Sequence, residues 1–68
     1  MQRHYVISSN LRSVGYSDNV LEIEFNSGGI YQYFNVPVEV FFRLMSAPSH
    51  GKFFHANIKN RYYYKRIA

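Results

Sequence analysis

A stretch near the middle of the chain limits the possible folds more than any other feature of the sequence. Leu21, Ile23 and Phe25 alternate with two glutamates, which is the period-two pattern of a strand with one buried face. An Asn-Ser-Gly-Gly turn follows, and a second run of β-favouring residues comes after it. The pattern predicts a β-hairpin of residues 20–25 and 29–34, with the apolar side chains toward a core and the glutamates toward water.

A further strand is expected before this hairpin. Residues 11–17 favour extended backbone, and the Asp18-Asn19 pair after them suits a tight two-residue hairpin turn. Gly15 lies inside this segment, where a glycine often marks a β-bulge. The first half of the chain therefore predicts a three-stranded antiparallel meander.

The hydrophobic period becomes helical in the second half. Pro37 suits the first position of a helix, because its missing N–H costs nothing there. Apolar residues recur at helical spacing as far as Ser46, and Pro48 ends this helix. Ser49 is well placed to cap a second helix of about residues 49–58.

These elements predict one α+β domain that covers residues 1–68. A chain of 68 residues has enough apolar surface for one core and not for two lobes. We expect a three-stranded antiparallel β-meander followed by two short helices packed on one face. A C-terminal extended segment, basic and aromatic, follows the helices, and residues 1–7 are expected to form a flexible arm.

The sequence offers little for catalysis. It has no cysteine, which excludes disulfides, thiolate metal sites and cysteine nucleophiles. His50 and His55 are five residues apart, not at the i, i+4 spacing of a helical zinc site, and no acid lies near them. Ser49 beside His50 is better explained as a helix cap than as a nucleophile. We therefore expect no enzymatic activity, no metal and no cofactor.

The sequence has no apolar segment of the kind that directs a protein into or across a membrane. The longest purely apolar run has three residues, far too few to cross a membrane. The first five residues lack the apolar region of a signal peptide. We expect a cytoplasmic protein with no membrane partner.

Charge is distributed unevenly along the chain. The sequence has 8 lysines and arginines against 4 acidic residues, and all the acids lie between Asp18 and Glu39. From residue 40 to the end there are only basic charges, and residues 59–66 interleave them with tyrosines. Cations bind phosphates and aromatic rings stack on bases, so this segment favours nucleic-acid contact. The alternative is a structural edge strand whose cations are solvated.

Tyr31 and Tyr33 share one face of their strand, opposite Ile30 and Phe34. If Ile30 and Phe34 join the core, the two tyrosines line an open sheet face on which unpaired bases stack. In the other arrangement the tyrosines point inward, where an amphipathic ring settles well at the edge of a core. The sequence leaves both arrangements open.

Several motifs together resemble a known family. The run from Leu21 to Pro37 reads L-x-I-x-F-x-S-G-G-x-Y-x-Y-F-x-V-P, and Ala47 to Phe54 reads A-x-S-x-G-x-F-F. With the positions of the flanking residues, these runs resemble the KTSC domain; the flanking residues are Ser9, Gly15, Tyr16, Ile58, Tyr62 and Tyr64. This family is named for the C-terminal domain of some lysyl-tRNA synthetases and also occurs as stand-alone bacterial and phage proteins. The resemblance implies a small β-β-β-α-type domain with a proposed RNA-binding role and no catalytic residues.

We therefore expect a small nucleic-acid-binding module. RNA, single-stranded or tRNA-like, is favoured over duplex DNA, because neither expected helix carries the row of polar and basic side chains of a major-groove reader. The alternative is a protein-interaction or homo-oligomerising module without catalytic activity. The expected nucleic-acid-binding residues are Tyr31, Tyr33, Lys52, Lys59, Arg61, Tyr63, Lys65 and Arg66.

Overall fold

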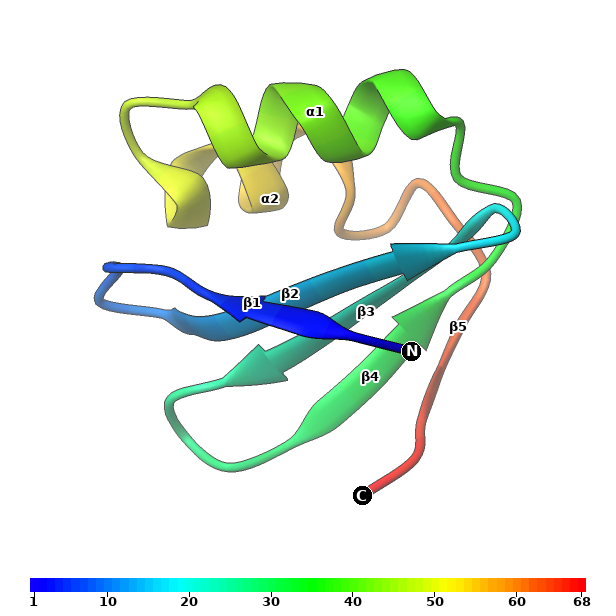
Figure 1. Ribbon diagram of the computed structural model, residues 1–68, viewed down its shortest axis with the longest axis horizontal. Helices are drawn as coiled ribbons and strands as arrows, with labels where there is room; N and C mark the ends of the chain where they lie inside the picture. The colour runs from blue at the N-terminus through cyan, green and yellow to red at the C-terminus, as the bar shows by residue number, and fades with distance from the viewer.

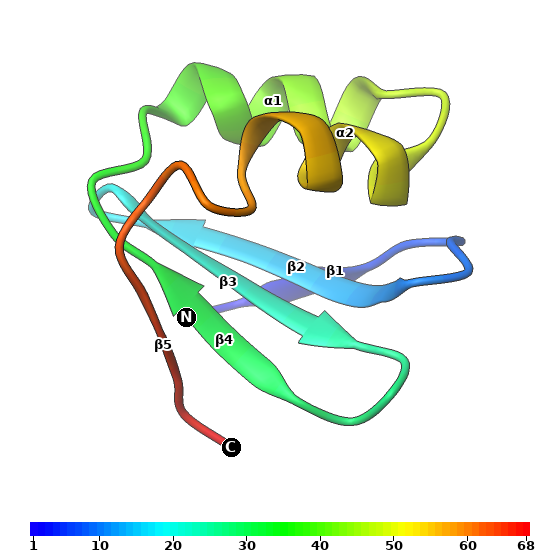
Figure 2. The same ribbon diagram turned by 180° about the vertical axis from the view of Figure 1, so that it is seen from behind.

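The computed structural model describes residues 1–68 as one antiparallel sheet under two helices. The strands lie in the order β1-β2-β3-β4-β5, and both helices cover the same face of the sheet (Figures 1 and 2). The elements are β1 (Arg3–Tyr5), β2 (Leu11–Ser17), β3 (Val20–Phe25), β4 (Ile30–Tyr33), α1 (Val38–Ser46), α2 (His50–Asn57) and β5 (Tyr64–Arg66).

The expected α+β class with an antiparallel sheet and two helices is confirmed, but the expected number of strands is wrong. β2, β3 and β4 form the meander, and one short strand is added at each edge. In the segment for which we expected an arm, β1 pairs with β2, with Arg3 opposite Gly15. The C-terminal extended segment contains β5, which pairs with β4. Each added strand has three residues, which is too few for a periodic pattern to predict. Of the two, the edge strand in the C-terminal segment was an alternative that the sequence left open.

Local turn and cap chemistry agrees with the sequence. Asp18 and Asn19 both have positive φ, at 51° and 64°, as a two-residue hairpin turn between twisted strands requires. The Ser49 hydroxyl accepts a hydrogen bond from the Lys52 backbone N–H at 3.2 Å and so caps α2. α1 begins one residue later than expected, because Pro37 occupies the cap position with extended backbone.

Gly15 serves a different purpose from the expected bulge. The irregularity in β2 lies between Leu11 and Ser13 instead. A Cβ at Gly15 would lie 2.7 Å from the backbone oxygen of Gln2, so only glycine lets the N-terminal segment cross β2 this closely.

The core fills the space between the sheet and the helices. Side chains from the inner face of β2 and β3 meet those of α1, α2 and the segment after β4. The fully buried apolar residues are Leu11, Val14, Leu21, Ile23, Val36, Leu44 and Ile58. Burial of these aliphatic side chains is the main source of stability in a domain of this size.

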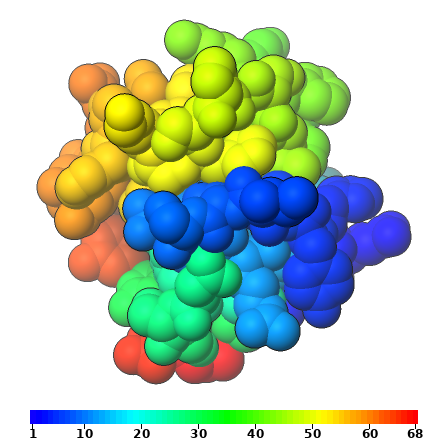
Figure 3. Space-filling model, turned by 90° about the vertical axis from the view of Figure 1, so that its left-hand side faces the viewer, coloured from blue at the N-terminus to red at the C-terminus, as the bar shows by residue number.

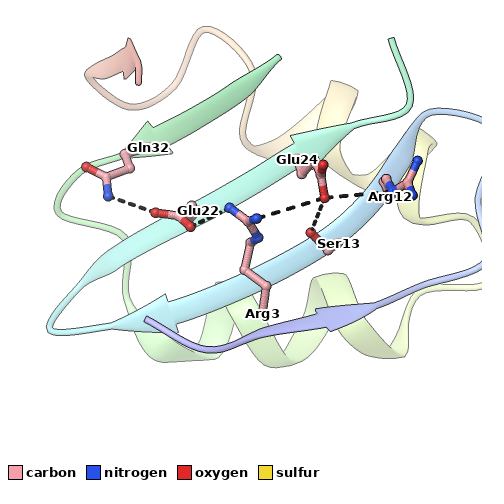
Figure 4. A network of polar contacts seen from close by, with 6 residues as sticks. All are labelled: Arg3, Arg12, Ser13, Glu22, Glu24 and Gln32. Atoms are coloured by element: carbon pink, nitrogen blue, oxygen red, sulfur yellow. Dashed lines mark hydrogen bonds and ion pairs between the residues drawn. The ribbon is translucent and has the colours of Figure 1, made fainter. Parts of the chain in front are cut away.

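Polar side chains on the outer face of the sheet bond to one another and are not fully solvated as expected. Glu22 was expected to be exposed, but only 7% of its surface is accessible. An Arg3 Nη1–Glu22 Oε2 ion pair of 2.7 Å joins β1 to β3, and Gln32 Nε2 donates to Glu22 Oε1 at 2.9 Å. Ser13 donates to Glu24 at 2.9 Å, and Arg12 lies 4.0 Å from the same carboxylate (Figure 4). The pairing of β1 explains the error, because Arg3 covers a face that a three-stranded sheet leaves open.

Removing the Tyr16 hydroxyl should destabilise the fold. It donates to the backbone oxygen of buried Val36 at 2.6 Å, whereas the Tyr16 ring stacks on Phe41. We expect Tyr16→Phe to keep the stacked ring and lose about 1 kcal/mol of unfolding free energy, measured by urea denaturation. Tyr5→Phe is the matched control, because Tyr5 is 78% exposed. Equal stability of the two variants would contradict this assignment.

The Glu22 carboxylate should stabilise the sheet through its two partners. We expect Glu22→Gln to lower the unfolding free energy by about 1–2 kcal/mol, because the charge-assisted bond to Arg3 is lost. Asp18→Asn removes the same charge at a turn position that asparagine tolerates equally, and serves as the control. A Glu22→Gln variant as stable as Asp18→Asn would show that the pair contributes nothing.

Candidate functional site

One cleft, with a volume of about 470 Å³, opens between the sheet and α2. Loops from one end of the sheet supply one side of it, and α2 with the residues after it supplies the other. Figure 3 shows the blue N-terminal loop between the yellow helical segment and the green β3–β4 turn. The lining residues are Ser9, Asn10, Phe25, Asn26, Ser27, Tyr31, Tyr33, Gly51, Phe54, His55, Lys59, Asn60 and Tyr64.

Five aromatic side chains in mutual contact form the apolar part of this lining, and we call them the ring cluster: Phe25, Tyr31, Tyr33, Phe54 and Tyr64. Tyr33 packs edge-on against Phe54, with centroids 5.6 Å apart, and Tyr64 tilts against Tyr33 at 5.7 Å. Phe25 joins Tyr31 to Phe54 by two further edge contacts. The cluster connects β3, β4, α2 and β5 and gives the cleft a rigid aromatic wall.

Strand register decides which way the two central tyrosines point. Leu21 lies opposite Tyr33 and Ile23 opposite Tyr31, so all four side chains share the helix-facing side of the sheet. The arrangement with the tyrosines on an open outer face is wrong, and the inward arrangement is the one that the structure has. Its physical reason is that α2 offers Phe54 as an apolar partner on that side.

Tyr33 lies deepest in the ring cluster. It is 5% exposed, so no face of its ring is free to stack on a base. Burial, and to a smaller extent the neighbouring Tyr31 and Tyr64, raises the pKa of Tyr33 to about 12. The phenol therefore stays protonated in all ordinary conditions and remains neutral at the back of the cleft.

Amide and hydroxyl groups form the polar part of the lining. Asn26 Nδ2 donates to the backbone oxygen of Ser8 at 2.9 Å, and the Asn26 backbone N–H donates to that of Asn10 at 2.9 Å. Ser8 Oγ accepts from the backbone N–H groups of Asn10 and Leu11, both at 3.2 Å. These bonds tie the β1–β2 loop to the β3–β4 turn. No aspartate or glutamate belongs to the lining, so the cleft holds no negative side chain.

Gly51 lets the helix approach the first of these loops. A Cβ built there would lie 2.6 Å from Asn10 Nδ2, which is closer than real Cβ contacts allow. Gly51 is buried in the first turn of α2, directly after the capping segment. The small residue in Ser49-x-Gly51 thus leaves room for the Asn10 amide where the structure places it.

The structure brings only part of the expected binding set to the cleft. Tyr31, Tyr33 and Lys59 line it. The Arg66 guanidinium lies at its border, with Cζ 6.0 Å from the centroid of the Tyr31 ring. These four come from β4, β5 and the segment after α2, which explains why no local pattern groups them.

The other expected residues lie outside the cleft. Lys65 is opposite Gln32 and so faces the outer side of the sheet, whereas its neighbour Arg66 faces the inner side. Tyr63 is 74% exposed and packs one face on Phe34, with centroids 5.7 Å apart. Lys52 and Arg61 are exposed and do not belong to the lining.

Sequence reasoning missed most of the polar lining. Ser9, Asn10, Asn26 and Ser27 come from two loops, and Asn60 follows α2. One signal was available: antiparallel pairing of β2 with β3 places the start of one strand beside the end of the other. The two asparagine-containing loops therefore had to meet, whereas the place of His55 depends on how α2 packs over the sheet.

No three histidine, aspartate or glutamate side chains come together in a way that would hold a metal ion. No helix reaches the length and apolar character needed to cross a membrane.

Comparison with known proteins identifies relatives along nearly the whole chain. The KTSC domain family matches residues 7–63. The crystal structure of a KTSC domain protein from Yersinia pestis superposes with a TM-score of 0.95 at 43% identity, covering 98% of this chain and 97% of that one. An uncharacterized protein of Stutzerimonas stutzeri is 44% identical over 98% of this chain and 99% of its own length.

A lysine–tRNA ligase of a Nostoc species is 46% identical over 48 residues, which are 71% of this chain. The match spans only 9% of the length of that ligase. The likeness therefore concerns one small part of a much larger protein.

The raised pKa of Tyr33 should make the fold sensitive to alkali. Unfolded tyrosine loses its proton near pH 10 and folded Tyr33 near 12, so the stability from keeping the phenol neutral is present below pH 10 and is lost as the pH rises through 12. We expect Tyr33→Phe to retain its unfolding free energy better than the parent between these values, measured by urea denaturation. Tyr5→Phe should follow the parent, and a Tyr33→Phe variant with parental pH dependence would refute the assignment.

Proposed function

Since this chain belongs to the KTSC domain family, we propose that it is a small, non-catalytic module that binds RNA. The observation that carries the proposal is a cleft that combines aromatic rings, amides and cations without a carboxylate. The similarity of the chain to part of a lysine–tRNA ligase supports RNA as the ligand, because that relative is named for a tRNA. An accessory binding role also agrees with the short length of the match.

The arrangement of ion pairs supports contact with phosphates. All three ion pairs in the structure join Arg3 or Arg12 to Glu22 or Glu24 on the outer face. None of them uses a cation from residues 40–68.

Lys59 lines the cleft without an ion-pair partner, so its charge is available to an RNA backbone. Arg66 at the border donates its Nε to the backbone oxygen of Ala68 at 2.7 Å, which leaves its Nη groups for a phosphate. Lys52 and Arg61 are exposed outside the lining.

The rings favour unpaired bases over a duplex. Tyr64 is half exposed and packs on Tyr31 at 6.0 Å, so the outer edge of the ring cluster is accessible. Stacking on aromatic side chains requires bases that are free of a paired partner. We therefore propose single-stranded segments, such as loops or ends, as the RNA that this module binds.

One observation favours a second candidate, a module that docks a protein or a second copy of itself. β1 is an edge strand with an unpaired side, and Ile7 beside it is 99% exposed. Edge strands of this kind pair readily with another chain. Sedimentation at several protein concentrations tests whether a second copy pairs at this edge, and a strict monomer would exclude that partner.

Binding should depend steeply on salt. We expect the association constant for a labelled single-stranded RNA to fall as the salt concentration rises. A plot of log K against log salt should be linear, with a slope of about −0.7 for each phosphate that the protein contacts. Fluorescence anisotropy at several salt concentrations measures this slope. Absence of binding at low salt, or binding that salt does not alter, would exclude the proposed function.

Neighbouring cations on β5 provide a matched pair of variants. We expect Arg66→Gln to weaken RNA binding roughly three- to tenfold and to lower the salt slope by about 0.7, because Arg66 borders the cleft. Lys65→Gln removes the same charge from the opposite face and should change the affinity little. If the two variants weakened binding equally, overall charge and not the cleft would be responsible.

A further inference from the structure

We propose that the cleft is a pocket for one unpaired RNA base. This inference rests on the proposed function and goes beyond it, because it assigns base contact to the cleft that the two loops and α2 complete, and not to the exposed part of the C-terminal tail. The pocket would hold the base between the ring cluster and the amides of Asn10, Asn26 and Asn60.

The polar lining has the chemistry of a base edge. Each asparagine amide offers both a donor and an acceptor, and the edges of all bases carry acceptors, most of them with donors beside them. A phosphate alone offers only acceptors and would leave the asparagine oxygens without partners. Asn26 Nδ2 spends one of its two N–H donors on the backbone oxygen of Ser8, so the second donor and the amide oxygen have no hydrogen-bond partner within the protein.

The apolar lining and the size of the cleft agree with the same ligand. A volume of about 470 Å³ lies within the range of roughly 300–1,000 Å³ that small-ligand pockets occupy. The ring cluster forms an aromatic wall, against which a base packs by stacking or edge contact.

The charges around the cleft suit the phosphates of the RNA on either side of the bound base. Lys59 and His55 belong to the lining, and Arg66 lies beside Tyr31 at its border. The absence of any lining carboxylate removes the repulsion that the phosphates of the bound nucleotide would meet. A base within the pocket and its phosphates along these cations satisfy both parts of the surface.

Gly51 makes the pocket testable without harm to the fold. An alanine here adds a methyl group to the lining and displaces the Asn10 amide, whose nitrogen would be only 2.6 Å from the new Cβ. That nitrogen is the free end of a flexible side chain, so the displacement is cheap for folding. Alanine also favours a helix more than glycine does, which makes loss of stability an unexpected result.

The experiment compares two RNA strands of equal length by fluorescence anisotropy, one ordinary and one with every base removed. Their phosphates are the same, so contact with cations alone binds both equally. We expect the abasic strand to bind about tenfold more weakly, the order of affinity that one stacked base contributes. We expect Gly51→Ala to bind the two strands alike, with an unchanged or raised urea midpoint.

The outcomes distinguish failure of the base pocket from failure of RNA binding. Equal, salt-dependent binding of both strands by the parent overturns the base pocket and leaves phosphate binding in place. Binding of neither strand overturns both. A parent that discriminates and a Gly51→Ala variant that discriminates equally overturns the pocket, since the base then binds elsewhere.

Asparagine variants and a mononucleotide locate the site. We expect Asn10→Ala to reduce discrimination between the strands, whereas Asn57→Ala should not, because the Asn57 amide bonds Phe53 within α2. In NMR spectra, adenosine monophosphate should shift the side-chain amide signals of Asn10, Asn26 and Asn60. Shifts produced equally by ribose 5-phosphate would identify a sugar-phosphate site and contradict base recognition.

Discussion

The antiparallel register of β3 and β4 is the constraint on which the rest of the structure depends. It places Tyr31 and Tyr33 beside Ile23 and Leu21 on the helix-facing side. A slip of one residue would turn both rings to the outer face and remove the partners of Phe54. The ring cluster, the packing of α2 and the wall of the cleft all follow from this one alignment.

The same sheet keeps two of the four carboxylates away from the cleft. Glu22 and Glu24 lie on the outer face, where Arg3 of β1 and Arg12 of β2 pair with them. The cations of the second half are left without such partners. A domain with a small net charge thereby gains a local positive field near the cleft, where a polyanion approaches.

The sequence predicted the features that depend on residues close together in the chain. Alternation in β3, the tight turn at Asp18-Asn19 and the Ser49 cap are local properties, and each was predicted. The direction of Tyr31 was not, because both faces of β4 carry large apolar side chains. The meeting of Asn10 with Gly51 also escaped, since it depends on how α2 sits over the sheet.

The cleft is lined from both ends of the chain, with Ser9 and Asn10 on one side and the segment from Lys59 to Tyr64 on the other. A ligand in the cleft therefore contacts both the loop before β2 and the short strand β5. Loops and terminal strands of this kind unfold locally at a low free-energy cost. Thermodynamic linkage then makes the ligand part of the fold. Each tenfold excess of free ligand over its dissociation constant adds about 1.4 kcal/mol against unfolding, and fraying of β5 weakens binding in return.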